Sequence, residues 1–224
     1  GYKKFVVDDN KRREISVASI RDRVVHRLIY DFLTALYDKT FIYDAWSCRA
    51  EKGVVGAIQR AKKFLCRWPD SFVWRADVKK FFDSVDQKTL LQILTRTIKD
   101  KKTRNLLEEI IKSFKIDEKR ERERESTGIP IGNLTSQIFA NIYLNEFDHF
   151  MKHTLKPQAY LRYGDDFIMI HPDTEKLQIL RESAVNYLKK VLKLDIHAKN
   201  DKVFKAKWGL KFLGVTIWPR GRQL

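Results

Sequence analysis

Two short segments of aromatic and branched residues, 160–163 and 167–170, flank the sequence Gly164-Asp165-Asp166. Residues of this kind favour β-strands and a glycine beside an aspartate favours a tight turn, so the pattern predicts a β-hairpin with two carboxylates at its turn. A further strand-like segment, residues 71–77, ends in Asp77. If these strands are neighbours in one sheet, three carboxylates meet, and this arrangement constrains the fold more than any other feature of the sequence.

The order of the expected elements after residue 70 is strand, helices, helix, strand, strand, helix, strand. This is the order of a split β-α-β unit, so we expect fold class α+β, with an antiparallel four-stranded sheet packed on helices. The helices are expected over residues 53–63, 136–149 and 174–193, with two more after a cap at Asp86, and short strands near 195–197, 202–205 and 211–217.

Two further patterns lie outside this unit. Residues 4–7 and 14–18 flank a basic turn and predict a hairpin, and apolar residues recur at helical spacing over 19–37, among them Val24 and Leu28. Residues 117–125 alternate in charge, which predicts an exposed connection. Because many folds share such a frame, function has to be argued from the site.

The charge of the chain restricts its partners. Its 224 residues include 45 Lys and Arg against 29 Asp and Glu, a formal charge of +16. Such an excess indicates a polyanionic partner, with nucleic acid first among the candidates. No apolar run approaches the roughly 20 residues of a membrane-spanning helix, and the start of the chain has no secretory signal. We therefore expect an intracellular protein without membrane attachment. Cys48 and Cys66 lack the spacing of a zinc site.

The three acidic residues suit a particular chemistry. Hard cations such as Mg²⁺ prefer oxygen ligands and bind through a few carboxylates together with substrate phosphates. Two such ions about 4 Å apart can activate a hydroxyl nucleophile and stabilise a leaving pyrophosphate. Gly-Asp-Asp alone is ordinary turn chemistry, so the inference depends on its combination with Asp77, the basic charge and the segments that follow.

Four segments occur in the order typical of reverse transcriptases, and the chain resembles that family from about Val6 to Pro219. The segments are Arg75-Ala76-Asp77-Val78-Lys79-Lys80-Phe81-Phe82, Gly128-Ile129-Pro130-Ile131-Gly132-Asn133-Leu134-Thr135-Ser136-Gln137, Tyr163-Gly164-Asp165-Asp166 and Leu210-Lys211-Phe212-Leu213-Gly214. The resemblance implies RNA-directed DNA polymerase activity on an RNA template with a DNA or RNA primer and dNTPs. It also implies the fingers and palm of a right-hand polymerase in a bacterial, cytoplasmic setting.

On this resemblance, residues 1–70 with part of 87–130 correspond to the fingers, 71–209 to the palm and 210–224 to a primer-grip hairpin at the border with the thumb. The helical thumb is expected beyond the last residue given. A piece without it is expected to hold primer-template poorly, since phosphate contacts supply most duplex affinity.

The chain resembles the group II intron-like superfamily, in which most bacterial members carry Gln-Gly and Ser-Pro at the two ends of the segment 131–137. Here the segment has Ile131-Gly132 and Ser136-Gln137, which resembles the reverse transcriptases of diversity-generating retroelements. Gly164 departs from that group, which more often has a bulkier residue at this position. The subgroup implies error-prone copying, a structured template RNA and a small basic accessory protein. Group II intron, retron and antiphage-defence enzymes stay open as alternatives. So do an RNA-dependent RNA polymerase, which Phe82 disfavours, and a non-enzymatic RNA-binding module, which the retained acids disfavour.

The resemblance assigns roles to the acidic cluster. Asp77, Asp165 and Asp166 correspond to catalytic residues, and with the Val78 carbonyl they correspond to the ligands of two Mg²⁺ ions, for which Mn²⁺ can substitute.

The residues that correspond to the dNTP site come from three segments. Phe82 would be the steric gate against a 2′-hydroxyl, and Arg13 would grip the triphosphate because its guanidinium is planar and always charged. The complete expected set is Lys11, Arg13, the backbone of Lys80 and Phe81, Phe82, Ile131, Gly132 and Gln137.

The nucleic-acid contacts follow the same resemblance. Phe212, Leu213 and Gly214 correspond to the primer grip, and Arg49 and Lys52 to template-binding residues. Lys199 and Lys202 are candidates for the acid that protonates pyrophosphate, although Asn200 stands at the position where the family usually has this lysine.

Overall fold

The computed structural model describes residues 2–9, 11–113 and 126–219, without the side chains of residues 2–4, 8–9 and 11–14. The charged segment predicted over 117–125 lies outside the described residues. The chain forms two compact units, one of residues 1–40 and 80–143 and the other of residues 41–79 and 144–224. We call them unit 1 and unit 2.

Unit 1 begins with the predicted hairpin, whose strands pair antiparallel over their full length. Its helices start at short polar caps, since Ser19, Asp86 and Asp100 each accept a hydrogen bond from the backbone three residues on. The elements are β1 (Tyr2–Asp9), β2 (Lys11–Ala18), α1 (Ile20–Tyr37), η1 (Asp38–Thr40), α3 (Phe81–Ser84), α4 (Gln87–Thr97), α5 (Lys101–Lys112) and most of α6 (Leu134–His149).

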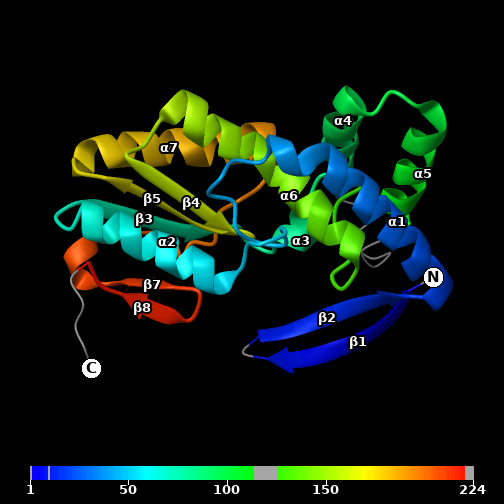
Figure 1. Cartoon of the computed structure of the whole chain (residues 1–224), viewed down its shortest axis with the longest axis horizontal. Helices are drawn as coiled ribbons and strands as arrows, with labels where there is room; N and C mark the ends of the chain where they lie inside the picture. Colours follow the sequence, from blue (N-terminus) through cyan, green and yellow to red (C-terminus); the bar gives the residue numbers. More distant parts are fainter. Residues whose placement is uncertain (1, 10, 114–125, 220–224) are drawn as a thin grey trace. The chain divides into compact units, whose positions relative to one another are not determined.

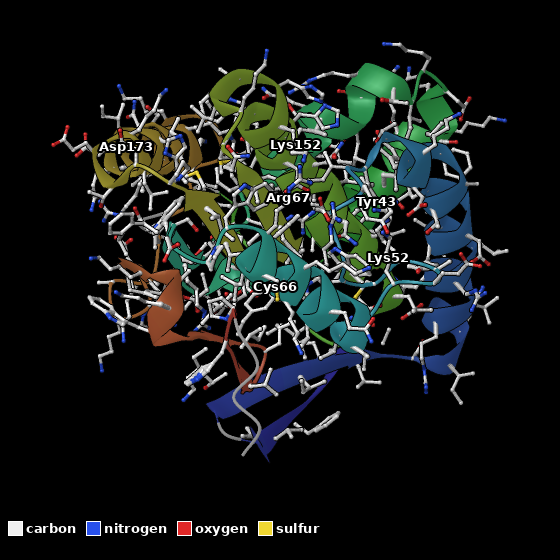
Figure 2. The ribbon with its side chains drawn as sticks, turned by 60° about the vertical axis from the view of Figure 1, so that its left-hand side comes forward. Tyr43, Lys52, Cys66, Arg67, Lys152 and Asp173 are labelled. Carbon is white, nitrogen blue, oxygen red and sulfur yellow. The ribbon has the colours of Figure 1, made fainter. Side chains whose placement is uncertain are left out.

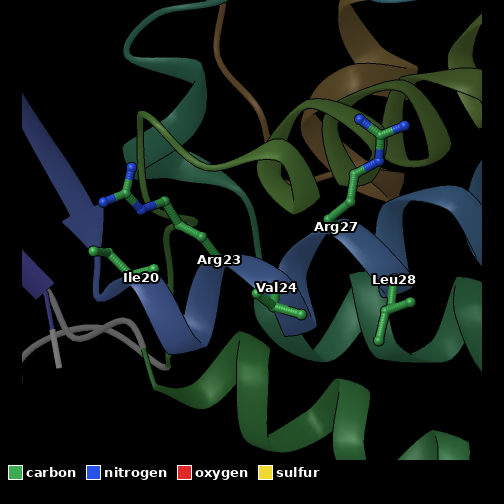
Figure 3. A pocket seen from close by; sticks show the side chains of 5 residues that line it. All are labelled: Ile20, Arg23, Val24, Arg27 and Leu28. Atoms are coloured by element: carbon green, nitrogen blue, oxygen red, sulfur yellow. The ribbon is translucent and has the colours of Figure 1, made fainter.

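Helix α1 confirms the predicted helix but buries only part of its apolar residues. Ile29 and Leu33 pack inward, and His26 Nδ1 lies 2.7 Å from Thr135 Oγ1 of α6, where burial lowers the pKa of the histidine. Val24 and Leu28 are exposed and line a surface pocket on the opposite side of the helix (Figure 3). The sequence therefore predicted the helix correctly, but which of its apolar residues are buried depends on how α1 packs in unit 1.

Unit 2 holds the predicted four-stranded sheet, in the order β4-β5-β3-β6 with every pair antiparallel. Figure 1 shows β3, β4 and β5 side by side, with α2 and α7 near them. The elements are α2 (Val54–Arg67), β3 (Phe72–Asp77), η2 (Phe150–Leu155), β4 (Ala159–Tyr163), β5 (Asp166–His171), α7 (Thr174–Val191), β6 (Lys202–Lys205), η3 (Ala206–Trp208), β7 (Leu210–Phe212) and β8 (Val215–Ile217).

Both faces of this sheet are buried. Successive side chains of a strand point to opposite faces, so alternate residues of β3 and β5 pack into different cores. On one face, Val73 and Ile168 belong to a core cluster with Phe64 of α2 and Phe212 of β7. On the other, the rings of Trp74 and Phe167 meet edge to face with centroids 5.2 Å apart, and Phe147 at the end of α6 packs on Phe167. Apolar side chains thus pack against both faces of the sheet. Among the described residues, no helix is long and apolar enough to cross a membrane.

Two glycines of unit 2 allow a matched test of packing. Gly209 and Gly214 have nearly the same φ, +87° and +86°, but a Cβ on Gly209 would lie 2.5 Å from the Trp218 ring, whereas one on Gly214 meets no described atom within 4 Å. Alanine at either position adds backbone strain of about 1 kcal/mol. We expect G209A to lower the free energy of unfolding by about 1–3 kcal/mol more than G214A because of overpacking. Urea denaturation measures the difference, and equal losses would contradict it.

Candidate active site

The four predicted metal-binding residues lie at or directly beside the ends of the neighbouring strands β3 and β5. In the β3–β5 register Asp77 is paired with Asp166, so both carboxylates leave the sheet on the same face. The Val78 amide donates a hydrogen bond to the Asp165 carbonyl over 3.2 Å. Asp165 itself occupies the predicted tight turn, after Gly164 with φ +61°. The local turn chemistry and the antiparallel register together bring these residues side by side in unit 2.

The end of β3 is fixed on its other side by the segment after α7. His197 N donates to the Asp77 carbonyl over 2.9 Å, and Lys79 N donates to the Asp195 carbonyl over 2.8 Å. One carboxylate oxygen of Asp77, Oδ1, is buried and has no hydrogen-bond partner among the described residues. Because a buried charged oxygen is costly unless it is paired or binds a metal, this atom fits a cation ligand.

Asp166 has a different environment. Its carboxylate forms a two-point ion pair with Arg75 of β3, with Nη2 2.8 Å from Oδ2 and Nε 3.2 Å from Oδ1. Sequence reasoning missed Arg75 in this role, although its position two residues before Asp77 on the same strand face would have been a signal. In the described part of the chain, no three His, Cys, Asp or Glu side chains converge on a point where they could hold a metal.

A buried polar network supports the hairpin from the other face of the sheet. Arg162 of β4 pairs with Asp148 at the end of α6, and both side chains are at most 1% exposed. The Tyr160 hydroxyl donates to Asp148 Oδ1 over 2.7 Å, and burial raises the pKa of Tyr160 well above its usual value. Arg162 also donates through Nη1 to the Gly164 carbonyl over 2.9 Å. Nothing in the local sequence pattern indicated this network.

The segment around the predicted steric gate is in unit 1. Lys80 has φ +46° and precedes the short helix α3, which begins with Phe81 and Phe82. Phe81 is buried against Tyr143, and Phe82 is half-buried with its ring 5.4 Å from that of Phe81. The Phe82 carbonyl accepts from Ile129 N over 2.8 Å. A left-handed backbone in a lysine is a strained feature that often marks a functional turn.

The loop that carries the subgroup signature packs on β2 in the same unit. Ser16 N donates to the Ile131 carbonyl over 2.9 Å, and Asn133 Nδ2 donates to the Ser16 carbonyl over 3.1 Å. Gly132 permits this approach, because a Cβ there would lie 2.8 Å from Ile15 Cγ2. Gln137 is exposed on α6. This loop is therefore tied to the hairpin that carries two predicted triphosphate residues.

Those two residues, Lys11 and Arg13, lie on β2, where their backbones pair with Asp9 and Val7. Their side chains lie outside the described residues. The predicted site thus divides between the units: the acids and their supports are in unit 2, and the expected dNTP residues are in unit 1.

Arg49 and Lys52, expected near the template, organise the loop before α2. Arg49 Nη1 donates to the Ile42 and Ala45 carbonyls over 2.8 and 3.1 Å. Lys52 Nζ donates to the Tyr43 carbonyl over 2.9 Å and lies 3.6 Å from the centre of the Tyr43 ring (Figure 2). Both side chains therefore have structural contacts that the sequence did not reveal.

The expected primer grip forms the hairpin of β7 and β8. Phe212 is fully buried in the core of unit 2, and the turn consists of Leu213 and Gly214, with φ +50° and +86°. A contact with a primer would therefore come from the turn and not from the Phe212 ring.

Comparisons with known proteins show the family of the chain. A family model described as reverse transcriptase (RNA-dependent DNA polymerase) matches residues 3–217. The chain therefore belongs to the reverse transcriptase family. The family implies dependence on a divalent metal.

Individual relatives are more distant. Protein YkfC of Escherichia coli strain K12 is 27% identical over 92% of this chain and 63% of its own length. The group II intron-encoded protein LtrA of Lactococcus lactis subsp. cremoris is 27% identical over 64% of this chain and 24% of its own. The putative COX1/OXI3 intron 2 protein of Saccharomyces cerevisiae is 28% identical over 62% of this chain and 16% of its own length. The chain thus spans less than two thirds of each of these relatives.

Solved structures confirm the fold. Apo telomerase from Candida tropicalis aligns with 97% of this chain and 47% of its own, at a TM-score of 0.69 and 14% identity. Telomerase from Candida albicans in complex with a fragment of telomeric RNA aligns with 96% and 43%, at a TM-score of 0.66 and 12% identity. The predicted α+β class with an antiparallel sheet is therefore correct.

The contacts of Arg49 lead to a prediction about stability. Arg49→Ala leaves the Ile42 and Ala45 carbonyls without this donor, so we expect a loss of about 1–3 kcal/mol in the free energy of unfolding. Lys62→Ala, at an exposed position of α2, should change it by less than about 0.5 kcal/mol. Denaturant titration of both variants decides the role of Arg49. Unchanged stability together with weaker RNA binding would instead favour a template contact.

Proposed function

We propose that this chain carries the catalytic centre of an RNA-directed DNA polymerase, which transfers a nucleotide from a dNTP to a primer 3′-hydroxyl on an RNA template. The observation that carries the proposal is the buried Asp77 Oδ1, without a partner among the described residues, beside the strand turn that presents Asp165. Membership of the reverse transcriptase family supports it. The net charge of +16 suits an RNA template and its primer as partners.

In this proposal Asp77 and Asp165 are the main metal ligands, with the Val78 carbonyl beside them. Two bound Mg²⁺ ions, or Mn²⁺ in their place, would lower the pKa of the primer hydroxyl and neutralise charge on the leaving pyrophosphate. Main-chain hydrogen bonds hold the two segments that carry these carboxylates: the bond from His197 holds the end of β3, and the bond from Val78 ties the turn to it. Asp166, paired with Arg75, completes the acidic site.

The residues proposed for dNTP selection are in unit 1. Phe82 would exclude a 2′-hydroxyl, and the backbone of Lys80 and Phe81 would face the triphosphate. Lys11 and Arg13 would neutralise its charge, the arginine through its planar fork. Ile131, Gly132 and Gln137 would flank the nucleotide and the template base.

The remaining assignments concern nucleic acid and domains. The turn of Leu213 and Gly214, with Phe212 as its buried anchor, would support the primer end. Arg49 and Lys52 would act on the template through the loop that they organise. Residues 1–70 with part of 87–130 would be the fingers, 71–209 the palm and 210–224 the primer-grip hairpin, in a bacterial cytoplasmic enzyme.

The proposal predicts loss of activity when a proposed metal ligand becomes an amide. Asp77→Asn and Asp165→Asn remove ligand charge at nearly constant volume, so incorporation should fall at least about 10³-fold, as expected when electrostatic stabilisation of the transition state is lost. The assay is dNTP incorporation on an annealed RNA template and DNA primer with Mg²⁺ or Mn²⁺, using the full-length protein. Asp70→Asn, at an exposed turn before β3, is the matched control.

The alternatives give different results in the same assay. Incorporation of ribonucleotides in preference to deoxynucleotides would favour an RNA polymerase. No incorporation by the unchanged protein, even with its native RNA and neighbouring proteins, would favour an RNA-binding module.

Within the family, we propose a place in a diversity-generating retroelement. The supporting observation is the sequence Ile131-Gly132 in a loop tied to Ser16, where a hydrogen-bonding glutamine is replaced by isoleucine. A structured template RNA and a small basic accessory protein would then be partners. The group II intron type is the alternative, since LtrA is among the relatives.

The subgroup predicts a particular error pattern. Loss of a polar contact to the nucleotide or template base lowers discrimination between bases, so misincorporation should concentrate at template adenines. Sequencing the products of the unchanged protein and of Ile131→Gln measures it, and we expect the variant to make fewer errors at adenine. Equal, low error rates at all four template bases would favour the group II intron alternative.

A further inference from the structure

We propose that Arg162, held in place by Asp148, is a positioning residue that sets the orientation of Asp165 in the catalytic turn. This inference rests on the proposed polymerase function, because only that function makes Asp165 a metal ligand. It concerns a buried arginine on the opposite face of the sheet from Asp77 and Asp166.

The ion pair is built as a rigid platform. Arg162 Nε lies 2.8 and 3.0 Å from the two carboxylate oxygens of Asp148, and Nη2 lies 2.6 Å from Oδ2. Tyr160 donates a further hydrogen bond to Asp148 Oδ1 over 2.7 Å. A buried charge pair of this kind is stable only when its remaining donors and acceptors are satisfied. The guanidinium is therefore fixed in one place between α6 and β4.

The backbone of Arg162 is held as well. Its N–H donates to the Asp44 carbonyl over 2.9 Å, and its carbonyl accepts from Trp46 N over 2.9 Å, so the segment around Ala45 runs beside β4 as a parallel bridge. The main chain of Arg162 and its Nε and Nη2 atoms are thus held by other residues, and the remaining nitrogen, Nη1, points to the turn.

Arg162 Nη1 forms a hydrogen bond with the peptide group that joins Gly164 to Asp165. Arg162 Nη1 binds the Gly164 carbonyl over 2.9 Å, and because the peptide is planar this fixes the plane that leads into Asp165. On the other side of Asp165, its own carbonyl accepts from Val78 N over 3.2 Å. The two peptide groups that flank Asp165 are thus held from β4 and from β3. Burial lowers the pKa of Arg162, but the attraction of Asp148, with a smaller contribution from Asp165, raises it above its usual value.

Arginine suits this task better than lysine. The planar fork presents several donors in fixed directions, so one side chain can bind a carboxylate with Nε and Nη2 and still direct Nη1 at a carbonyl. Lysine keeps the charge but presents a single compact ammonium. Arg162→Lys should therefore preserve charge neutralisation of Asp148 and lose the constraint on the turn.

The first experiment compares Arg162→Lys with Arg181→Lys in the full-length protein. Arg181 of α7 forms a similar pair with Asp201, with Nε 2.8 Å from Oδ1, in the same unit. We expect kcat for dNTP incorporation to fall about 10- to 100-fold in R162K, the range found when a residue that orients a metal ligand is changed, with a smaller effect on the KM for dNTP. R181K should keep the unchanged protein's kcat.

Hydrogen exchange supplies a readout that does not depend on activity. In R162K the amides of the hairpin turn and of Val78 should exchange faster, while those of α7 and of the core strands keep their rates. R181K should leave the turn unchanged. Faster exchange throughout unit 2 in R162K would show a merely structural role and would overturn the proposal.

A triple variant separates positioning from folding if R162K unfolds. Asp148→Leu, Tyr160→Phe and Arg162→Met together replace the network by apolar side chains, a change that often leaves stability equal or higher. We expect this variant to unfold at a Tm no lower than that of R162K and to have lost activity. A folded triple variant with the unchanged protein's kcat would overturn the proposal. If the unchanged protein itself fails to incorporate dNTP, the proposed function fails, and hydrogen exchange alone decides whether Arg162 holds the turn.

Discussion

The antiparallel register of β3 against β5 is the constraint on which the candidate site depends. It pairs Asp77 with Asp166 and places the Val78 amide on the Asp165 carbonyl. A shift by one residue would turn every side chain of β3 to the opposite face of the sheet. The register is enforced by cores on both faces, since Val73 packs toward α2 and Trp74 packs on Phe167. The burial of apolar side chains thus fixes the position of the acids.

Arginines on the two faces of this sheet give the acids different environments. Arg75 binds Asp166 on the face of the acidic cluster, and Arg162 binds Asp148 on the other face. Asp77 keeps one buried oxygen without a partner among the described residues. Because the environment of a carboxylate decides its role, three aspartates that look alike in sequence become a proposed ligand, a paired acid and a buried support.

In unit 1 the loop before α6 depends on the close approach of its main chain to β2. Gly132 lets the main chain of Ile131 and the side chain of Asn133 bind the main chain of Ser16, and the Ile129 amide donates to the carbonyl of Phe82. These bonds order the segments proposed to select the nucleotide. The same unit leaves an apolar side of α1 exposed, so the period of a helix is a weaker guide to its buried face than the elements that surround it.

The sequence by itself determined most of the elements, the α+β class, the turn at Gly164 and Asp165 and the family, because strand alternation, helical period and turn chemistry are local properties. The strand expected near 195–197 was wrong, since the structure has only an isolated bridge between Ile196 and Val78 there. It also located Asp77, Asp165 and Asp166, whose roles stay predictions. Only the tertiary structure decided that Arg75 binds Asp166, that Arg49 holds the loop before α2 and that Arg162 connects Asp148 to the Gly164 carbonyl. Which partner a long charged side chain selects depends on burial and on segments brought together by folding, and local sequence does not encode either.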